Sequence, residues 1–411
     1  MPDALDVYLN RDLAGRLREE QGRLFFAYEK RWLGSEQFIP LSVTMPPQET
    51  QFTDGIARPF FENLLPEGEI RAAIAKLRHV SERNTFGLLG EIGGDCAGAV
   101  SLWPTGEKPR KDEGYSPIGD ERLEALLDAM QKRPLLAADD EWRLSLAGAQ
   151  EKLPVYYDGT RLHLPKGSAP SSHILKPGAP HFQSMPANED FCMKLASAAG
   201  LPVPQSDVLR RPRTLYLVRR YDRTPAGSGK LVRIHQIDFC QALNLPSSRK
   251  YEHEGGPSLA ACFDVIARYS TQPARDRLNL ISWAIFNFLI GNADAHAKNL
   301  SLLVTREGIS LAPFYDLVST AVYAGLTGKL ALKVGGENRP GWLQRRHWEE
   351  FAKISGANPR IVRRRIAELS EELPELARET AGRLSLEKGE QALIERIRET
   401  IGQRGGRLLR K

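Results

Sequence analysis

The run from Gly291 to Asn299, with the sequence GNADAHAKN, holds a carboxylate at Asp294 and a carboxamide at Asn299. A second carboxylate, Asp316, follows within the tripeptide Phe-Tyr-Asp. These residue types, in this order, suit an enzyme that transfers the terminal phosphoryl group of ATP. Asp294 would orient an attacking hydroxyl and accept its proton, while Asn299 and Asp316 would bind the Mg²⁺ ions that neutralise the phosphates.

The spacing of Asp294 and Asn299 is by itself a weak signal, because a chain of this length shows it by chance about once. The alternative is a polar loop that caps the helix ending near Ile290. Residues 276–290 are apolar almost all round, which predicts a buried, rigid helix on which a catalytic loop would be held accurately. Residues 300–312 predict a hairpin that returns Asp316 towards Asn299. The crowding of titratable groups favours a functional site.

A candidate phosphate loop lies between the predicted strands 142–146 and 153–157. Its small residues Ala147, Gly148 and Ala149 would let backbone N–H groups approach phosphates, and Gln150, Glu151 and Lys152 complete it. The segment lacks the Gly-x-Gly-x-x-Gly pattern, so a plain β-turn is an equal alternative.

Lys176 ends an apolar strand predicted over 173–176, where a lysine is costly to bury without an anionic partner. ATP phosphates or Glu189 would supply that partner, and a lysine that simply reaches solvent is the alternative. Further along, Arg219, Arg220 and Tyr221 leave a strand predicted over 214–219. That exit would connect two lobes and offer backbone groups to adenine.

Composition sets the outer limits on what the chain is. Its 411 residues are 41% hydrophobic and 26% charged, which indicates a globular protein of two or three domains. A net charge of +6 is only weak support for nucleic-acid binding in a chain this long. The longest apolar run, 280–290, is too short to cross a bilayer, so no membrane contact is expected. The N-terminus lacks a signal-peptide pattern and the four cysteines are scattered, which favours the cytoplasm.

The order of predicted elements indicates an α+β fold, because strands dominate the first part of the chain and helices the last. Residues 1–105 read as a small β-rich domain in which the pattern turns helical between 61 and 78. Residues 106–140 read as a Pro- and Gly-rich linker and a helix over 120–132. Residues 141–235 would form a strand-rich lobe and 236–411 a helical lobe. Loop, lysine, connector, Asp/Asn pair and final Asp then follow the order of parts in a bilobal phosphotransferase.

With these residues in view, the chain resembles the HipA family of bacterial serine/threonine protein kinases, the toxins of toxin–antitoxin pairs. The resemblance covers most of the chain and is thinnest between Gly325 and Pro340. The motifs that carry it are SLAGAQEK at 145–152, HILK at 173–176, NLPSSRKYE at 244–252, GGP at 255–257, DAHAKN at 294–299 and PFYD at 313–316.

The resemblance implies a bilobal protein-kinase-like fold with a β-rich N-terminal subdomain and lobe and an all-helical C-terminal lobe. It also implies ATP and Mg²⁺ as cofactors, Asp294 as the catalytic proton acceptor, and Asn299 and Asp316 as metal ligands. The implied ATP-binding residues are Ala147, Gly148, Ala149, Gln150, Glu151, Lys152, Lys176, Arg219, Arg220, Tyr221, His296, Ala297, Lys298, Asn299, Tyr315 and Asp316. Family members autophosphorylate the serine at the position of Ser145, which expels the phosphate loop.

The implied partners are a helix-turn-helix, HipB-like antitoxin, operator DNA reached indirectly through that antitoxin, and a protein substrate. The substrate would be a translation factor such as an aminoacyl-tRNA synthetase. One departure concerns Arg219, which stands where a known member of the family carries an acidic residue, so side-chain contacts to adenine or ribose would differ.

Two other functions use the same residues. A small-molecule kinase of the aminoglycoside or choline type would need an acidic acceptor site, but Lys329, Lys333 and Arg339 follow Asp316 among several glycines. That composition favours a mobile loop for a macromolecule. A catalytically idle partner that helps an antitoxin occupy DNA is the second alternative, and the intact Asp294, Asn299 and Asp316 argue against it.

Overall fold

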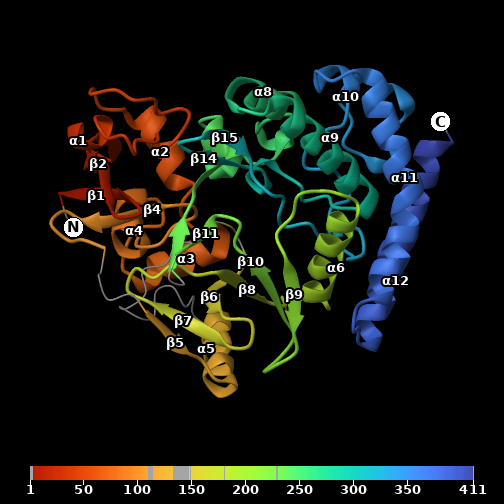
Figure 1. The fold of residues 1–411 in the computed structure, drawn as a ribbon, viewed down its shortest axis with the longest axis horizontal. Coiled ribbons are helices and arrows are strands. Elements are labelled where there is room, and N and C mark those ends of the chain that lie inside the picture. Colours follow the sequence, from red (N-terminus) through yellow and green to blue (C-terminus); the bar gives the residue numbers. More distant parts are fainter. Residues whose placement is uncertain are drawn as a thin grey trace.

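The structure, a computed structural model, describes residues 3–109, 114–132, 148, 150–179, 181–227 and 230–410. Within these residues the chain forms sheets of four, six, two and three strands, together with helices that are concentrated in its last third. Figure 1 shows the N-terminal sheet at one side of the molecule, the two longest helices at the other, and the six-stranded sheet between and below them. The expected α+β composition is confirmed.

The N-terminal domain is a four-stranded antiparallel sheet with four helices. Its strands follow the order β3-β2-β1-β4, which places β1 inside the sheet and explains why all its residues are buried. The elements are β1 (Ala4–Leu9), β2 (Asp12–Glu20), β3 (Arg23–Tyr28), α1 (Lys30–Leu33), α2 (Asp54–Glu62), α3 (Gly68–Leu77), α4 (Thr85–Ile92) and β4 (Val100–Pro104).

The helical pattern expected between 61 and 78 covers the end of one helix and the whole of the next. The helix α2 ends at Glu62 and α3 begins at Gly68. Pro66 lies between them and has no N–H with which to continue a helix. It pairs instead with Gly148 in a parallel bridge, so the break brings the N-terminal domain to the predicted phosphate loop.

The six-stranded sheet is antiparallel in the order β5-β7-β6-β8-β10-β9. Its elements and neighbours are β5 (Gly114–Pro117), α5 (Asp120–Lys132), β6 (Leu153–Tyr157), β7 (Leu162–Lys166), β8 (His173–Pro177), α6 (Met185–Ala198), β9 (Ser206–Leu209), β10 (Leu215–Arg219) and the ribbon β11 (Arg223–Ala226) and β12 (Lys230–Arg233). The segment expected to be a linker thus contains a strand, β5, which pairs with β7. The predicted strand 142–146 lies outside the described residues.

The C-terminal lobe is mostly helical and not all-helical as expected, because the predicted hairpin joins β13 there in a three-stranded sheet. Its elements are β13 (His235–Asp238), α7 (Phe239–Ala242), η2 (Ser247–Arg249), η3 (Glu252–Glu254), α8 (Leu259–Tyr269), α9 (Pro273–Ile290), η4 (Ala297–Asn299), β14 (Ser301–Thr305), β15 (Gly308–Leu311), η5 (Pro340–Trp342), α10 (Arg345–Ile354), α11 (Pro359–Gly382) and α12 (Lys388–Leu409). Every residue from Leu280 to Ile290 is buried, as the apolar sequence of α9 predicted. Across the described ranges, no helix combines the length and apolarity needed to cross a membrane.

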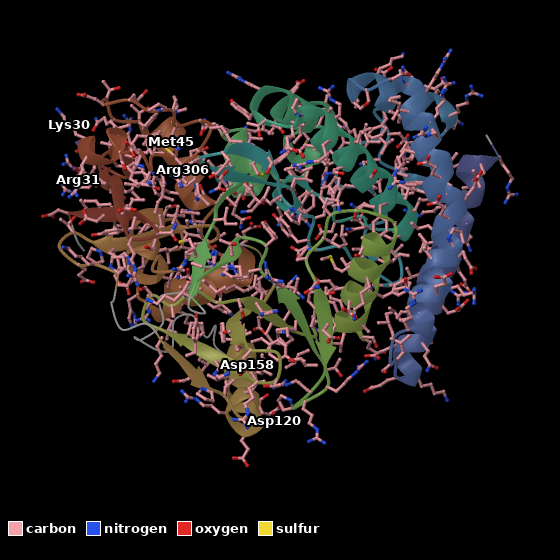
Figure 2. The ribbon with its side chains drawn as sticks, viewed as in Figure 1. Lys30, Arg31, Met45, Asp120, Asp158 and Arg306 are labelled. Atoms are coloured by element: carbon pink, nitrogen blue, oxygen red, sulfur yellow. The ribbon has the colours of Figure 1, made fainter. Side chains whose placement is uncertain are left out.

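Two hydrophobic cores hold these parts together. The larger one is continuous from the N-terminal sheet to α9 and α11 and includes Phe60, Phe239 and Phe286. The smaller one lies between α5 and the six-stranded sheet. Charged side chains cover the outside: in Figure 2, Lys30 and Arg31 lie at the outer edge of the N-terminal domain, and Asp120 and Asp158 at the far end of the six-stranded sheet. The N-terminal domain is therefore packed into the helical lobe by apolar contacts.

Candidate active site

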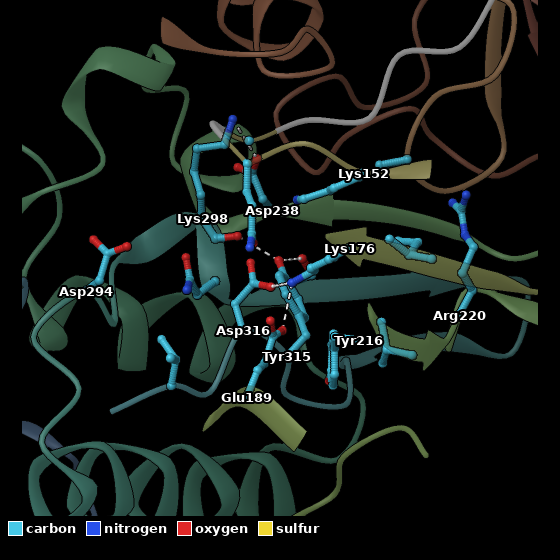
Figure 3. A pocket seen from close by; sticks show the side chains of 18 of the residues that line it. Lys152, Lys176, Glu189, Tyr216, Arg220, Asp238, Asp294, Lys298, Tyr315 and Asp316 are labelled. Carbon is cyan, nitrogen blue, oxygen red and sulfur yellow. Dashed lines mark hydrogen bonds and ion pairs between the residues drawn. The ribbon is translucent and has the colours of Figure 1, made fainter. Parts of the chain in front are cut away.

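A cavity of about 800 Å³ lies between the six-stranded sheet and the helical lobe. Asp294, Asn299 and Asp316 all line it, although 22 positions separate the first from the last in the sequence, as counted from their residue numbers. Figure 3 shows Asp316 beside Lys176, with Asp294 farther to the left. The structure therefore brings together the three residues that were expected to converge.

Lys176 is the centre of a buried charge cluster. Its Nζ lies 2.7 Å from Oε1 of Glu189 and 2.5 Å from Oδ1 of Asp316. Burial opposes the lysine charge, but the Asp316 and Glu189 carboxylates outweigh it and raise the pKa of Lys176. Burial also raises the pKa of Glu189, to about 7, whereas Lys176 holds the pKa of Asp316 below its usual range against the opposing effect of burial. Lys176 thus has the anionic partners that its buried position requires.

The helix α6 and the backbone after Asp316 fix this cluster from two sides. Glu189 lies in the first turns of α6, on a stretch that is fully buried. The adjacent Asn188 donates from Nδ2 to the Ser319 carbonyl at 3.0 Å and accepts the Ser319 N–H at 2.9 Å. Asp316 itself has a left-handed backbone, with φ of 54°, a conformation that aspartate tolerates better than most residues. Asp316 is therefore held by its own backbone turn and by the bonds from α6 to the nearby Ser319.

The loop that carries Asp294 begins at a glycine that nothing larger could replace. Gly291 ends α9 in the left-handed region, with φ of 79°, and a Cβ there would lie 2.7 Å from the Ala321 side chain. Its carbonyl accepts the Thr320 and Ala321 N–H groups at 3.1 and 3.0 Å. These bonds tie the start of the loop to the chain that follows Asp316, so the two carboxylates share one support.

Asp294 is exposed, and its carboxylate is oriented by Tyr251. The Tyr251 hydroxyl donates to Oδ1 of Asp294 at 2.6 Å, while its ring meets the His296 ring edge-to-face at 5.1 Å. Burial, followed by the Asp294 charge, raises the pKa of Tyr251, so the phenol stays protonated and remains a donor. Burial lowers the pKa of His296 to about 4, which keeps that imidazole neutral near pH 7.

Lys298 and Tyr315 pin the other end of the loop. The Tyr315 hydroxyl donates to the Lys298 carbonyl at 2.6 Å, and the ring of Tyr315 stacks on Tyr221 with centroids 5.6 Å apart. The Lys298 ammonium is buried and lies 2.8 Å from Oε1 of Glu67. Both Lys298 and Tyr315 line the cavity, whereas the predicted Ala297 is buried and forms no part of its wall.

The phosphate-loop prediction is covered only in part by the described residues. Gly148, Gln150, Glu151 and Lys152 line the cavity, and Gly148 has φ of 114°, which favours glycine. A Cβ at Gly148 would come within 2.9 Å of the Lys152 Nζ, so the loop passes close over that ammonium. The predicted Ser145, Ala147 and Ala149 lie outside the described residues.

The connector predicted to lie beside adenine also reaches the cavity wall. Arg219, Arg220 and Tyr221 all line it, next to the apolar side chains of Ile174 and Val218. The Arg220 guanidinium, however, is buried in an ion pair with Asp222 at 2.7 Å and donates to Ser171 at 3.1 Å. Any contact of Arg220 with a nucleotide would therefore use its backbone or its aliphatic stem.

Three residues of the site were not among the sequence candidates: Tyr251, Lys250 and Glu67. Lys250 and Tyr251 lie in the motif at 244–252, which supported the family resemblance but gave no function to either residue. Glu67 comes from the N-terminal domain and carries no motif, so only the fold brings it to the loop. Glu189 had been considered only as a possible partner of Lys176.

The oxygen donors at this cavity fit Mg²⁺ that is shared with a nucleotide. Asp316 and Asn299 offer carboxylate and carboxamide oxygens, the hard ligands that Mg²⁺ prefers. Within the part of the chain that the structure describes, no three His, Cys, Asp or Glu side chains group closely enough to hold a metal ion. Mg²⁺ in phosphotransferases usually takes one or two protein ligands and completes its coordination with phosphate oxygens and water, which suits Asn299 and Asp316.

Two family models match the chain. Residues 5–103 match the HipA N-terminal domain, and residues 144–377 match the HipA-like C-terminal domain. The chain belongs to the HipA family. Together the two matches include every residue discussed above as part of the site, from Glu67 in the first to Asp316 in the second.

Individual relatives extend over most of the chain. It is 32% identical to the serine/threonine-protein kinase toxin HipA of Shewanella oneidensis, with 82% of this chain and 79% of that protein covered. It is 41% identical to Y4mE of Sinorhizobium fredii, a protein that carries the name of a kinase, over 89% of each. The solved complex of Shewanella oneidensis HipA, HipB and operator DNA contains a chain that matches with a TM-score of 0.87 at 28% identity, over 98% of this chain and 97% of that one. The bilobal, kinase-like α+β fold is thereby confirmed.

Proposed function

We propose that this member of the HipA family is an ATP- and Mg²⁺-dependent serine/threonine protein kinase that acts as the toxin of a toxin–antitoxin pair. One observation carries the proposal: Lys176, Asp294, Asn299 and Asp316 line a single cavity. These are the side chains that phosphoryl transfer requires, and their order matches that of other kinases.

In the proposed reaction, the Asp294 carboxylate accepts the proton of a serine or threonine hydroxyl. The hydroxyl oxygen forms a bond to the γ-phosphorus of ATP, and the bond from that phosphorus to the β,γ-bridging oxygen breaks to release ADP. Tyr251 supports this step because its hydrogen bond to Oδ1 leaves the second carboxylate oxygen of Asp294 for the acceptor. Proton acceptance by a positioned side chain typically contributes a factor of about 10² to 10⁴.

The other side of the cavity would stabilise the phosphates. Mg²⁺, when bound, would neutralise phosphate charge, and Asn299 and Asp316 would hold it. Lys176 would contact the phosphates while Glu189 keeps its ammonium in place. Ile174, Val218 and the backbone of Arg219, Arg220 and Tyr221 would border adenine, as their places in the cavity wall suggest.

A protein acceptor is favoured over a small molecule. Asp294 is exposed, whereas Lys176 and Asn299 are buried, so a hydroxyl on a large molecule could reach Asp294. By family analogy, the acceptor would be a translation factor such as an aminoacyl-tRNA synthetase. Incubating the protein with labelled ATP in a lysate, with Asp294→Asn as the control, would identify the labelled protein. Equal labelling by both forms would contradict the proposal.

The proposed antitoxin is a HipB-like helix-turn-helix protein, through which the chain would reach operator DNA. The support is the similarity, over nearly the whole chain, to the Shewanella oneidensis protein whose solved complex contains HipB and operator DNA. Co-expression with the neighbouring open reading frame, followed by co-purification, tests the pairing. A kinase that purifies alone and binds no such partner would count against it.

Ser145 is the proposed site of autophosphorylation. A dianionic phosphate placed just before a phosphate-binding loop would be repelled from that site, which would switch the enzyme off. Incubation with Mg·ATP and peptide mass spectrometry should therefore find a phosphate on Ser145. Phosphate found only at other residues would remove this form of self-inactivation.

A further inference from the structure

The segment between α2 and α3 of the N-terminal domain reaches the candidate active site. Pro66 forms a parallel bridge with Gly148, and the Glu67 N–H donates to the Gly148 carbonyl at 3.2 Å. Glu67 and Asn63, both from this segment, line the cavity together with Gly148. The N-terminal domain thus contributes part of the cavity wall, although none of the catalytic candidates lies in it.

The carboxylate of Glu67 joins two lysines of the helical lobe. Its Oε1 lies 2.8 Å from the Lys298 Nζ, and its Oε2 lies 2.7 Å from the Lys250 Nζ. The three side chains are only 12%, 6% and 16% exposed, respectively. Burial opposes the charge of Glu67, but the two lysines outweigh it and lower its pKa to about 2. This carboxylate is therefore charged at any physiological pH.

Each of these lysines adjoins a residue that the proposed reaction needs. Lys250 precedes Tyr251, which holds Asp294 by a hydrogen bond of 2.6 Å. Lys298 precedes Asn299, the proposed metal ligand. Through Lys250 and Lys298, the Glu67 carboxylate is therefore linked to both ends of the loop that runs from Asp294 to Asn299.

We propose that Glu67 is a positioning residue, through which the N-terminal domain sets the geometry of the catalytic loop. This inference rests on the proposed function for its catalytic consequence. Glu67 acts through Lys250 and Tyr251 on Asp294, and through Lys298 on Asn299.

The N-terminal domain is held firmly enough to serve as a support. Its core is continuous with that of the helical lobe. Two hydrogen bonds also cross the junction near Glu67: Gln241 Nε2 donates to the Phe60 carbonyl at 3.0 Å, and Asn63 Nδ2 to the Leu245 carbonyl at 2.9 Å. Because the N-terminal domain is fixed in this way, the Glu67 carboxylate restricts the positions of the Lys250 and Lys298 side chains.

A second role for the lysines would be direct contact with phosphates, with Glu67 as a competitor for them. The surroundings of Lys298 favour positioning. Asn63 Oδ1 accepts from its Nζ at 2.9 Å, and an Asp238 carboxylate oxygen lies 3.6 Å away. With partners on several sides, this ammonium is anchored to the protein.

The test compares Glu67→Gln with a matched control, Asp95→Asn. Asp95 also belongs to the N-terminal domain, is 10% exposed, and pairs across the junction with Arg233 at 3.0 Å and Arg223 at 3.8 Å, neither of which lies in the catalytic loop. Glu67→Gln should lower kcat about tenfold, since small displacements of reacting groups are costly, while the Kd for ATP stays within about twofold. Asp95→Asn should change kcat by less than about twofold. Glu67→Asp, which keeps the charge, should recover part of the loss.

A second readout does not depend on activity. Hydrogen exchange of the amides in residues 292–300 should become faster in Glu67→Gln and stay unchanged in Asp95→Asn. Equal loss of kcat in both variants would reduce Glu67 to a docking contact, and a gain of activity would make it an inhibitory competitor. If the wild type transfers no phosphate, the proposed function fails, and the exchange data still decide whether Glu67 positions the loop. Unchanged exchange in Glu67→Gln would overturn the inference.

Discussion

The two sides of the cavity are built differently. On the phosphate side, Lys176 and Glu189 are 3% and 4% exposed and are joined, with Asp316, in one cluster of ion pairs. On the hydroxyl side, Asp294 is exposed, and its carboxylate is oriented by the hydroxyl of Tyr251. The phosphate side is therefore organised before any ligand arrives, whereas the hydroxyl side is open to solvent.

This difference suits a kinase whose two substrates differ in size. A nucleotide of fixed shape gains from groups that need no rearrangement when it binds, because fixed charges stabilise a transition state at no cost of reorganisation. A protein acceptor needs an approachable carboxylate, and a buried Asp294 would exclude it. The variants below test whether the two sides are as independent as their burial suggests.

Asp294→Asn should have the largest effect. It removes the proton acceptor at the open side while leaving the buried cluster around Lys176 unchanged. We expect phosphoryl transfer to fall by about 10³-fold or more, with ATP affinity within about threefold of wild type. Single-turnover assays and calorimetric titration with ATP would measure the two quantities. Near-wild-type turnover would refute the role given to Asp294, and lost ATP binding would show that the two sides are coupled.

Lys176→Met should come next and should affect stability as well as activity. It leaves the buried Glu189 carboxylate and the half-buried Asp316 carboxylate without their cation, and removing one partner of a buried pair typically costs about 3–5 kcal/mol. We expect a similar loss in unfolding free energy and a fall in kcat/KM for ATP of about 10²-fold. Chemical denaturation and steady-state kinetics would measure these changes.

Glu189→Gln is the matched control for Lys176→Met. Burial raises the pKa of Glu189 to about 7, so this side chain gives up its charge more readily than an ordinary glutamate. Neutral glutamine should therefore be tolerated better than the loss of Lys176, with a smaller decrease in stability. A Glu189→Gln variant as unstable as Lys176→Met would show that the glutamate charge is essential to the cluster.

Tyr251→Phe removes one oxygen atom at the open side. A hydrogen bond to a charged group is typically worth about 1.5–3 kcal/mol, so we expect kcat to fall about tenfold or somewhat more. The KM for ATP should be unchanged, because Tyr251 contacts Asp294 and no part of the Lys176 cluster. An increase in kcat would instead mean that the tyrosine blocks the acceptor. Comparing kcat and KM for both substrates separates these outcomes.

Tyr251 also marks the limit of what the sequence could predict. The helix α9, the hairpin after Asn299 and the place of Lys176 at the end of a strand follow from local patterns of apolar residues and turns. The convergence of Asp294 and Asp316 followed from the short hairpin between them. Tyr251 is 43 positions away from Asp294, and no local pattern relates two residues across such a distance.

The N-terminal domain was harder to predict for the same reason. Its strands are short and clear, and Pro66 is a local sign of the break between α2 and α3. Nothing local shows that Pro66 pairs with Gly148, 82 positions further along the chain. A helical pattern from 61 to 78 contains no sign of that partner. The contact of Glu67 with Lys298 is longer still, so its role depended wholly on the tertiary fold.

Acid should destabilise the folded protein through its buried histidines, one of which, His296, lies in the catalytic loop. Burial lowers the pKa of His296 to about 4, so the folded protein keeps this ring neutral at pH values where an unfolded histidine takes up a proton, near 6.5. Between pH 6.5 and 4 the unfolded chain therefore binds more protons, and the unfolding free energy falls as the pH falls. Above pH 6.5 this contribution is fully present.

Each buried histidine takes up a single proton, which limits its share of the acid effect. One histidine contributes at most about 1.4 kcal/mol per pH unit to the slope of stability against pH. His235, on β13, has a pKa lowered to about 4 by burial and should add a similar slope far from the loop, where its Nε2 lies 2.8 Å from the Leu41 carbonyl. Urea unfolding measured from pH 7.5 to 4.5 gives the slope of unfolding free energy against pH. This slope should be shallower for His296→Asn than for wild type, and it should also be shallower for His235→Asn. If only His235→Asn changed the slope, His296 would already exchange protons in the folded state, and the catalytic loop would be more open than its burial indicates.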